Sequence, residues 1–198
     1  MLRMKRLVVA GVALALGMVA TAVATQPVMA SSGGEAATLT YDSYEDAVPG
    51  IAPPGSDATA IFLDRDGQPI SIDGIEATSM EAAAWACTPV SGRDNPHYSS
   101  GDASGHGWWK KGTCDNNRAD VYNCLYEWYT DNSWRNKACS NIKRLRPYTG
   151  SGDRTVARRA CDNQLVTTWR NYVDVDVVDE WDTGEQPYRE DDIGCRVY

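Results

Sequence analysis

Residues 167–178 read Thr-Thr-Trp-Arg-Asn-Tyr-Val-Asp-Val-Asp-Val-Val, and this stretch decides the fold class. Odd positions from 169 to 177 carry Trp, Asn and three Val, while even positions from 170 to 178 carry Arg, Tyr, two Asp and Val. Such an alternation is typical of a β-strand with one face on the core and the other in water. We expect the valines on the core and Asp174 and Asp176 in water, because a one-residue slip would bury both carboxylates.

The chain around this stretch is also rich in strand-forming residues. From Cys87 onward Trp, Tyr and β-branched residues alternate with frequent turn residues, and no long helical periodicity is present. We expect strands near 105–111, 119–129, 134–145, 154–161, 167–178 and 190–197. Short strands separated by turns at even intervals predict an all-β fold, an antiparallel β-sandwich.

Six cysteines follow residue 86, and an even number in an exported chain predicts three disulfides that staple the sandwich. They are Cys87, Cys114, Cys124, Cys139, Cys161 and Cys195. A turn at Asp131-Asn132 places Cys124 opposite Cys139 in a hairpin, close enough for a bridge. We expect a four-residue loop, 130–133, because it puts this pair at a non-hydrogen-bonded position, where side chains are closer.

The other four cysteines allow three connectivities. If the strands alternate up and down, Cys161 and Cys195 end at one pole of the sandwich and Cys114 lies at the other. This placement favours the pairs Cys161–Cys195 and Cys87–Cys114.

The first thirty residues have the order of a secretory signal peptide: basic residues, then an apolar run over 7–20, then two small-x-small sites. Cleavage after Ala24 or Ala30 fits these sites, and Pro27 favours Ala30. The apolar run is near the lower length limit for a membrane span and is rich in Ala. We therefore expect a secreted, extracellular protein with no stable membrane insertion after cleavage.

Between the signal peptide and the cysteine-rich domain, 87–198, the chain has two predicted parts. Residues 31–58 are small, polar and acidic, which predicts a disordered, flexible linker. Residues 59–76 carry two apolar runs around Asp64-Arg65-Asp66-Gly67, which predicts a β-hairpin rather than a calcium loop, because the other calcium ligands are missing. A short helix capped by Ser79 is expected over 78–86.

The net charge of −8 and the cysteine and histidine content exclude several kinds of ligand. An acidic chain repels phosphate backbones, so nucleic acid is not an expected partner. No C-x-x-C is present and the only histidines are His97 and His106, so the sequence predicts no metal site and no cofactor.

Several blocks of the domain together resemble a group of small secreted actinobacterial proteins that has no assigned activity. The blocks are Cys-Thr-Pro-Val at 87–90, Asp-Asn-Pro-His at 94–97, Gly-His-Gly-Trp-Trp at 105–109, Gly-Ser-Gly-Asp-Arg at 150–154 and Trp-Arg-Asn-Tyr-Val-Asp-Val-Asp at 169–176. The resemblance covers about 84–198 and implies a secreted β-rich domain without known catalytic residues. It also implies that the bridge between Cys124 and Cys139 is an addition, since many members lack these cysteines.

The aromatic residues are the main candidates for ligand binding. Tyr122, Tyr126 and Trp128 share one strand face and could stack on sugar rings, and Trp108 and Trp109 form a second aromatic group. The same residues could instead form the core of the sandwich. Whether they are buried or line a groove decides between the two interpretations.

Charge is segregated along the domain. Residues 135–170 hold nine Lys and Arg, and residues 171–192 hold nine Asp and Glu. Neighbouring strands of opposite sign can pair across a sheet. A basic strip over 143–159 that binds a wall polyanion, and a calcium site at Asp179, Asp182 and Glu185, are the functional alternatives.

No recognisable catalytic constellation is present, because the chain has neither a Gly-x-Ser-x-Gly elbow nor a His-Glu-x-x-His motif. The leading hypothesis is a non-enzymatic extracellular domain that binds a cell-wall or environmental polymer. One alternative is a secreted hydrolase of polysaccharide or peptide that uses His106 with Ser104, or paired carboxylates such as Asp176. The other is an inhibitor or effector that docks to a secreted protein.

Overall fold

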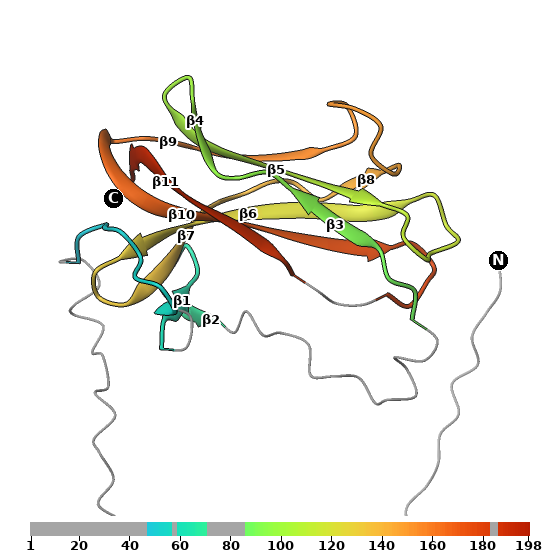
Figure 1. Ribbon diagram of the computed structural model, residues 1–198, viewed down its shortest axis with the longest axis horizontal. Helices are drawn as coiled ribbons and strands as arrows, with labels where there is room; N and C mark the ends of the chain where they lie inside the picture. Colours follow the sequence, from blue (N-terminus) through green and yellow to red (C-terminus); the bar gives the residue numbers. More distant parts are fainter. Residues whose placement is uncertain (1–46, 57–58, 71–85, 183–185) are drawn as a thin grey trace, which may run out of the picture. The chain divides into compact units, whose positions relative to one another are not determined.

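The computed structural model of the chain describes residues 47–56, 59–70, 86–182 and 186–198 (Figure 1). All of these residues belong to one compact unit, Leu39–Tyr198. The predicted signal peptide, the first part of the predicted linker and nearly all of the predicted helix at 78–86 lie outside the described residues.

Within these ranges every regular element is a strand, and the strands form two sheets. The large sheet has seven strands: β1 (Ile61–Leu63), β2 (Pro69–Ile70), β6 (Ala119–Tyr129), β7 (Ser133–Cys139), β8 (Lys143–Leu145), β10 (Asn163–Val177) and β11 (Tyr188–Arg196). The small sheet has four: β3 (Val90–Arg93), β4 (His97–Ser99), β5 (Asp102–Lys110) and β9 (Thr155–Ala160). Apart from the parallel pair β1–β7, all pairings are antiparallel, so the prediction of a disulfide-stapled antiparallel sandwich is confirmed.

In the large sheet the strands follow the order β11-β10-β6-β7-β1-β2, and β8 lies beside the first residues of β6. In the small sheet β5 is central, as Figure 1 shows. Gly107 pairs with both Arg93 and Thr155, and Ser104 pairs with both His97 and Arg158. Strands β3 and β4 therefore share one edge of β5, and β9 occupies the other.

Two apolar clusters fill the space between the sheets. One cluster contains Leu125 and Trp169, and the other contains Trp109 and Val173, all fully or almost fully buried. Interdigitation of the two inner faces is how a sandwich buries the apolar side of each strand. Removal of a buried aromatic side chain from such a core costs about 3–5 kcal/mol.

A polar centre interrupts this core, because β6 and β10 each place an Asn between the two clusters. Asn123 Nδ2 donates to Asn171 Oδ1 over 2.9 Å and to the carbonyl of Gly105 over 3.0 Å. Thr155 Oγ1 donates to Asn123 Oδ1 over 2.8 Å. A Cβ at Gly105 would lie 2.7 Å from Asn171 Cγ, so only glycine lets β5 approach this closely. The buried amides are paired, as buried polar groups must be to avoid a large desolvation cost.

The predicted alternation of β10 is correct on its inner face and partly wrong on its outer face. The three valines, Val173, Val175 and Val177, are buried between the sheets as expected. Asp176 is exposed as expected, but Asp174 is half-buried, and Arg170 and Tyr172 are buried on the same outer face of the large sheet. They are buried because the β1–β2 hairpin and Tyr188, from distant parts of the chain, cover that face.

The β6–β7 hairpin differs from the expected loop by one residue and still joins the expected cysteines. The loop has three residues, because Tyr129 pairs with Ser133 and Asn132 takes a left-handed conformation at φ 64°. A bulge then adds Lys137 to β7 between Asn136 and Ala138, which restores the register that places Cys124 opposite Cys139.

All three predicted disulfides are present, and no described cysteine is free. Cys124–Cys139 closes the β6–β7 hairpin, and Cys161–Cys195 joins the start of β10 to the end of β11. Cys87–Cys114 joins the segments that flank β3 and β5.

Residues 47–56, near the end of the predicted linker, are more ordered than expected. Residues 47–56 were expected to belong to a disordered linker, but they are bonded to the β6–β7 hairpin. The N–H of Gly50 donates to the carbonyl of Trp128, the N–H of Thr130 donates to the carbonyl of Val48, and Pro49 bridges to Tyr129. The linker therefore does not include these residues. The predicted β-hairpin is confirmed as β1–β2, and Asp64 Oδ1 accepts hydrogen bonds from the backbone N–H groups of Asp66 and Gln68, so this Asp closes a turn.

Candidate functional site

The aromatic residues predicted to bind a ligand mostly belong to the core. Trp109 is fully buried between the sheets, and Trp128 and Tyr126 are buried on the outer face of the large sheet. Tyr122, on that same face, and Trp108, on the small sheet, are only partly buried. Tyr122, Tyr126 and Trp128 do lie on one face of β6, as predicted, but β1 and β2 cover Tyr126 and Trp128.

A groove remains open at the end of this face. We call it the tyrosine groove, and it is lined by Tyr122, Cys124, Tyr126, Tyr172, Val173, Asp174 and Gln186. Its walls come from adjacent strands, because β6 and β10 pair with Tyr122 opposite Asp174 and Cys124 opposite Tyr172. The rings of Tyr126 and Tyr172 meet edge to face at 5.5 Å, which fixes both side chains.

Asp174 is the charged group of the tyrosine groove. Burial, together with the charges of Asp176 and Asp182, raises the pKa of this carboxyl to about 6, although hydrogen bonds from the Val175 N–H and the Tyr122 hydroxyl act in the opposite direction. Burial and the charges of Asp174 and Asp176 raise the pKa of Tyr122, so its hydroxyl stays protonated. The groove thus presents a phenol donor beside a carboxyl that changes charge near neutral pH.

Trp108 occupies a different face, the outer side of the small sheet. Its indole lies over Gly92, where an added Cβ would come within 2.0 Å of Nε1, and it packs against Tyr148 at 5.1 Å. Glycine at 92 is therefore required for this side chain to lie flat on β3. The sequence did not reveal that Trp108 has Tyr148 as its partner.

The two histidines also meet on the outer side of the small sheet, together with Asp94. We call these three residues the Asp-His cluster. His106 Nδ1 lies 2.5 Å from Asp94 Oδ2, and the rings of His97 and His106 stack at 5.4 Å with an interplanar angle of 20°. One ligand atom from each of the three residues falls within 4.8 Å of the others. The sequence predicted no metal site here, because Asp94 and His106 are brought together only by the pairing of strands.

Ser104, the expected partner of His106 in a hydrolase, shares that strand face but is buried and forms no hydrogen bond with either histidine in the described part of the chain. The group that orients His106 is Asp94.

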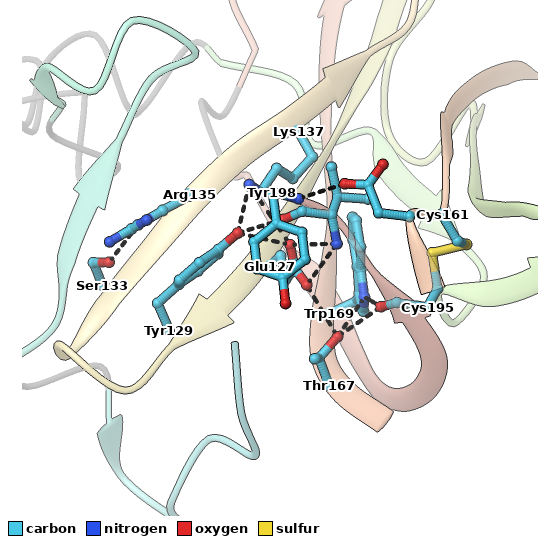
Figure 2. Close-up of polar contacts among 12 residues, drawn as sticks. Glu127, Tyr129, Ser133, Arg135, Lys137, Cys161, Thr167, Trp169, Cys195 and Tyr198 are labelled. Carbon is cyan, nitrogen blue, oxygen red and sulfur yellow. Dashed lines mark hydrogen bonds and ion pairs between the residues drawn. A yellow bond between two sulfur atoms is a disulfide. The ribbon is translucent and has the colours of Figure 1, made fainter. Parts of the chain in front are cut away.

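Figure 2 shows a third polar cluster, the Glu127 network, in the core near the C-terminal strand. The carboxylate of Glu127 is fully buried. The backbone N–H of Val197 donates to both of its oxygens, over 3.2 Å to Oε1 and over 3.3 Å to Oε2. Thr167 Oγ1 and the Tyr129 hydroxyl also lie within hydrogen-bond distance of it, and Lys137 Nζ is 3.7 Å away. A ligand cannot reach a carboxylate with zero exposure, so Glu127 is not a binding residue. The network instead holds Val197 against β6.

Burial dominates the electrostatics of the Glu127 network. It raises the pKa of Glu127 to about 7, although Lys137 and the hydrogen-bond donors act in the opposite direction. It lowers the pKa of Lys137 to about 8 against the attraction of Glu127. Both shifts mean that the charged forms are costly in this part of the core.

The charged residues that were considered for a calcium site or a polyanion site mostly form hydrogen bonds and ion pairs within the fold. Asp182 accepts a hydrogen bond from the backbone N–H of Val177, and Glu180 accepts those of Asp115 and Asn116, so these carboxylates hold a turn rather than gather around one point. Glu185 lies outside the described residues.

Cross-strand pairing accounts for part of the segregated charge. Arg170 pairs with Glu190 across β10–β11, Arg144 with Asp120 across β8–β6, and Arg158 with Asp102 across β9–β5. Opposite charges on neighbouring strands stabilise a sheet by a few tenths to about 1 kcal/mol each.

No protein-family model, curated protein or solved structure matches this chain. Among the residues that the structure describes, no helix has the length and apolar character needed to cross a membrane. The arrangement of side chains is thus the basis for any functional conclusion.

Proposed function

We propose that this protein is a secreted, non-enzymatic domain that binds a polysaccharide of the cell wall or of the environment in the tyrosine groove. The observation that carries the proposal is the convergence of three tyrosines and Asp174 on one groove at the outer face of the large sheet. Carbohydrates have apolar ring faces and hydroxyl edges, so they suit a site with aromatic walls and a few polar groups.

Export supports the same proposal. The three disulfides are typical of proteins that work in an oxidising environment, and the signal-like N-terminus agrees with them. The resemblance to secreted actinobacterial proteins is a further, sequence-based reason to expect work at the cell surface or beyond it.

The charge around the groove narrows the class of sugar. Asp174 lies in the groove and Asp176 and Asp182 act on it through their charges, and the whole chain carries −8. A polyanion such as a teichoic or uronic acid chain would be repelled. A neutral polysaccharide, or one with free amino groups, fits these charges.

The rigid tyrosines favour recognition without large rearrangement. Tyr126 and Tyr172 are buried except for the edges that line the groove, and Phe62 contacts both rings edge to face. Tyr122 is more exposed and supplies the ring on which a sugar can stack. A preformed site loses little conformational entropy on binding.

The test is retention on insoluble polysaccharides and titration with soluble fragments of those that retain the protein. Tyr122→Ala and Asp174→Asn are expected to weaken binding about tenfold or more, which corresponds to about 1.4 kcal/mol. The matched control is Tyr148→Ala, which removes a partly buried tyrosine that packs on Trp108 of the small sheet, and it should bind like the unmodified protein.

Absence of binding to any neutral or amino polysaccharide, or equal binding by Tyr122→Ala, would contradict the proposal. Release of soluble sugars from a retained polymer would instead promote the hydrolase alternative.

A further inference from the structure

The Asp-His cluster arises from an interruption between two short strands. Strand β3 ends at Arg93 opposite Gly107, and β4 begins at His97 opposite Ser104, so residues 94–96 pass alongside 105 and 106 on the same edge of β5. His97 shares the face of Ser104, to which it is paired, and His106 lies two residues further along that face. Both imidazoles therefore project from the outer side of the small sheet.

Asp94 is fixed in place by several hydrogen bonds. Its Oδ1 accepts the backbone N–H of His106 over 2.7 Å and lies 3.3 Å from Asn171 Nδ2, and its backbone carbonyl accepts from the same amide over 3.1 Å. Asn171 belongs to the buried polar centre between the sheets. The carboxylate is thus oriented by the core, which leaves Oδ2 directed at the ring of His106.

The partners of the two rings determine which nitrogen holds the proton. His106 Nδ1 faces the Asp94 carboxylate, and His97 Nδ1 lies 3.0 Å from the carbonyl oxygen of Asn95. Both oxygens are acceptors, so in the neutral rings both protons are on Nδ1. The lone pair of each ring then resides on Nε2.

This is the arrangement that metal-binding histidines adopt. Such a histidine donates its other ring N–H to a carboxylate or a backbone carbonyl, which sets the tautomer and the orientation of the ring. Here one histidine has the carboxylate and the other has the carbonyl, and the two rings are neighbours at 5.4 Å. The side chain of His106 is 12% exposed and that of His97 is 41% exposed. His106 is therefore held in place by its surroundings, while His97 is open to solvent.

We propose that His97 and His106 bind one divalent transition-metal ion through their Nε2 atoms, with Asp94 as the positioning residue for His106. Two neutral imidazoles and water suit Zn²⁺ and Cu²⁺, and the general order of stability predicts tighter binding of Cu²⁺. The two rings are stacked with an interplanar angle of 20°, so both Nε2 atoms reach one ion only when the exposed His97 ring turns out of the stack and gives up its contact with the Asn95 carbonyl. This site is on the opposite sheet from the tyrosine groove and is independent of the function proposed there.

The surrounding charge agrees with a cation. Asp94 contributes a carboxylate, and Asp191, on β11, accepts a hydrogen bond from Asn95, the residue that follows Asp94. Arg158, on the neighbouring strand β9, is paired with Asp102 at 3.0 Å. A bound divalent ion therefore meets local negative charge.

The experiment is a calorimetric titration of the purified, disulfide-bonded protein without a polyhistidine tag, using Zn²⁺ and Cu²⁺ in separate runs. We expect one ion per chain with a Kd below about 100 μM. His97→Gln and His106→Gln should each weaken binding at least tenfold, and Asp94→Asn should weaken it about 10- to 100-fold. Asp120→Asn, which breaks the comparable ion pair with Arg144 on the large sheet, is the control and should bind normally.

A second measurement does not depend on the variants. In the long-range ¹H–¹⁵N NMR spectrum of the unmodified protein, both rings should show the Nδ1–H tautomer, and Zn²⁺ should shift both Nε2 resonances. Binding that is weaker than this limit, equal binding by His97→Gln, or neutral rings that carry the proton on Nε2 and do not respond to Zn²⁺ would each overturn the proposal.

Discussion

The ammonium of Lys137 lies 3.7 Å from the carboxylate of Glu127 because a bulge in β7 turns Lys137 toward the core. Lys137 also donates a 2.7 Å hydrogen bond to the Tyr129 hydroxyl, which itself donates to the carbonyl of Val197. A single inserted residue thus links β7 to the end of the chain. Burial makes the charged forms of Glu127 and Lys137 unfavourable, so the free energy of unfolding should depend on pH.

Stability should fall as pH rises from about 4.5 to 7. The pKa of Glu127 is raised from 4.5 to about 7, so the folded protein binds more protons than the unfolded chain in this window. The free energy of unfolding then decreases with pH, by up to about 3 kcal/mol for this group. Urea unfolding of Glu127→Gln, which keeps an acceptor for Val197, should show a much flatter profile between pH 5 and 7 than the unmodified protein. Identical slopes in the two proteins would show that Glu127 is ionised throughout.

The opposite trend is expected at high pH. The pKa of Lys137 is lowered to about 8, so between about 8 and 10.5 the unfolded chain binds the extra proton and stability should rise with pH. Lys137→Met should remove this rise in the same urea experiment. A profile that keeps the rise in Lys137→Met would assign it to another group.

The close approach of β5 to the buried amides makes Gly105 a sensitive position. Gly105→Ala places a Cβ 2.7 Å from Asn171 Cγ and should lower the free energy of unfolding by about 1–3 kcal/mol. Gly150→Ala is the matched control, because nothing lies within 4 Å of the added carbon, and it should leave stability nearly unchanged. Equal thermal midpoints for the two variants would mean that β5 and Asn171 are not in contact.

The hairpin disulfide should contribute stability without defining the fold. Cys124 and Cys139 are 15 residues apart, and closure of such a loop contributes about 3 kcal/mol in the chain-entropy model. The double variant Cys124→Ala/Cys139→Ala should lose about this free energy and keep the far-ultraviolet spectrum of the sandwich. Loss of the folded state at 25 °C would show that the bridge is required for folding.

Phe62 is expected to matter for the outer face of the large sheet. Its ring stacks on Trp134 at 6.4 Å and contacts Tyr126 and Tyr172. Phe62→Ala should cost about 2–4 kcal/mol and make tryptophan fluorescence more accessible to acrylamide, because Trp134 loses its cover. An unchanged quenching constant would mean that the β1–β2 hairpin does not protect this face.

The sequence predicted the parts of the fold that local patterns determine. The alternation of Val173 and Val175 located β10, and the even spacing of cysteines around one turn located the bridge of Cys124 with Cys139. Strands β3 and β4 were missed because Val90–Arg93 and His97–Ser99 are too short and too rich in Gly and Ser to alternate. The loop of the β6–β7 hairpin was wrong by one residue because the bulge at Lys137 leaves no mark in the hydrophobic pattern.

The candidate sites were harder to predict from the sequence than the strands, because they form between segments that are far apart along the chain. Tyr126 is buried by Phe62, which lies 64 positions earlier in the chain, and nothing in the local pattern shows this contact. Asp94 and His106 are held together by the edge of β5 and by Asn171. Only the tertiary structure could show that Tyr122, which is partly buried, shares a groove with Asp174.

The most direct test of the proposed binding function is to locate a bound sugar by NMR. Titration of the ¹⁵N-labelled protein with a soluble fragment of a retained polysaccharide should shift the resonances of the tyrosine groove, those of Tyr122, Tyr172 and Asp174 above all. Resonances of Trp108, on the small sheet, and of Tyr148, which packs on it, should stay in place. Shifts confined to Trp108 and Tyr148, or no shifts at saturating sugar, would contradict the assignment of the groove as the binding site.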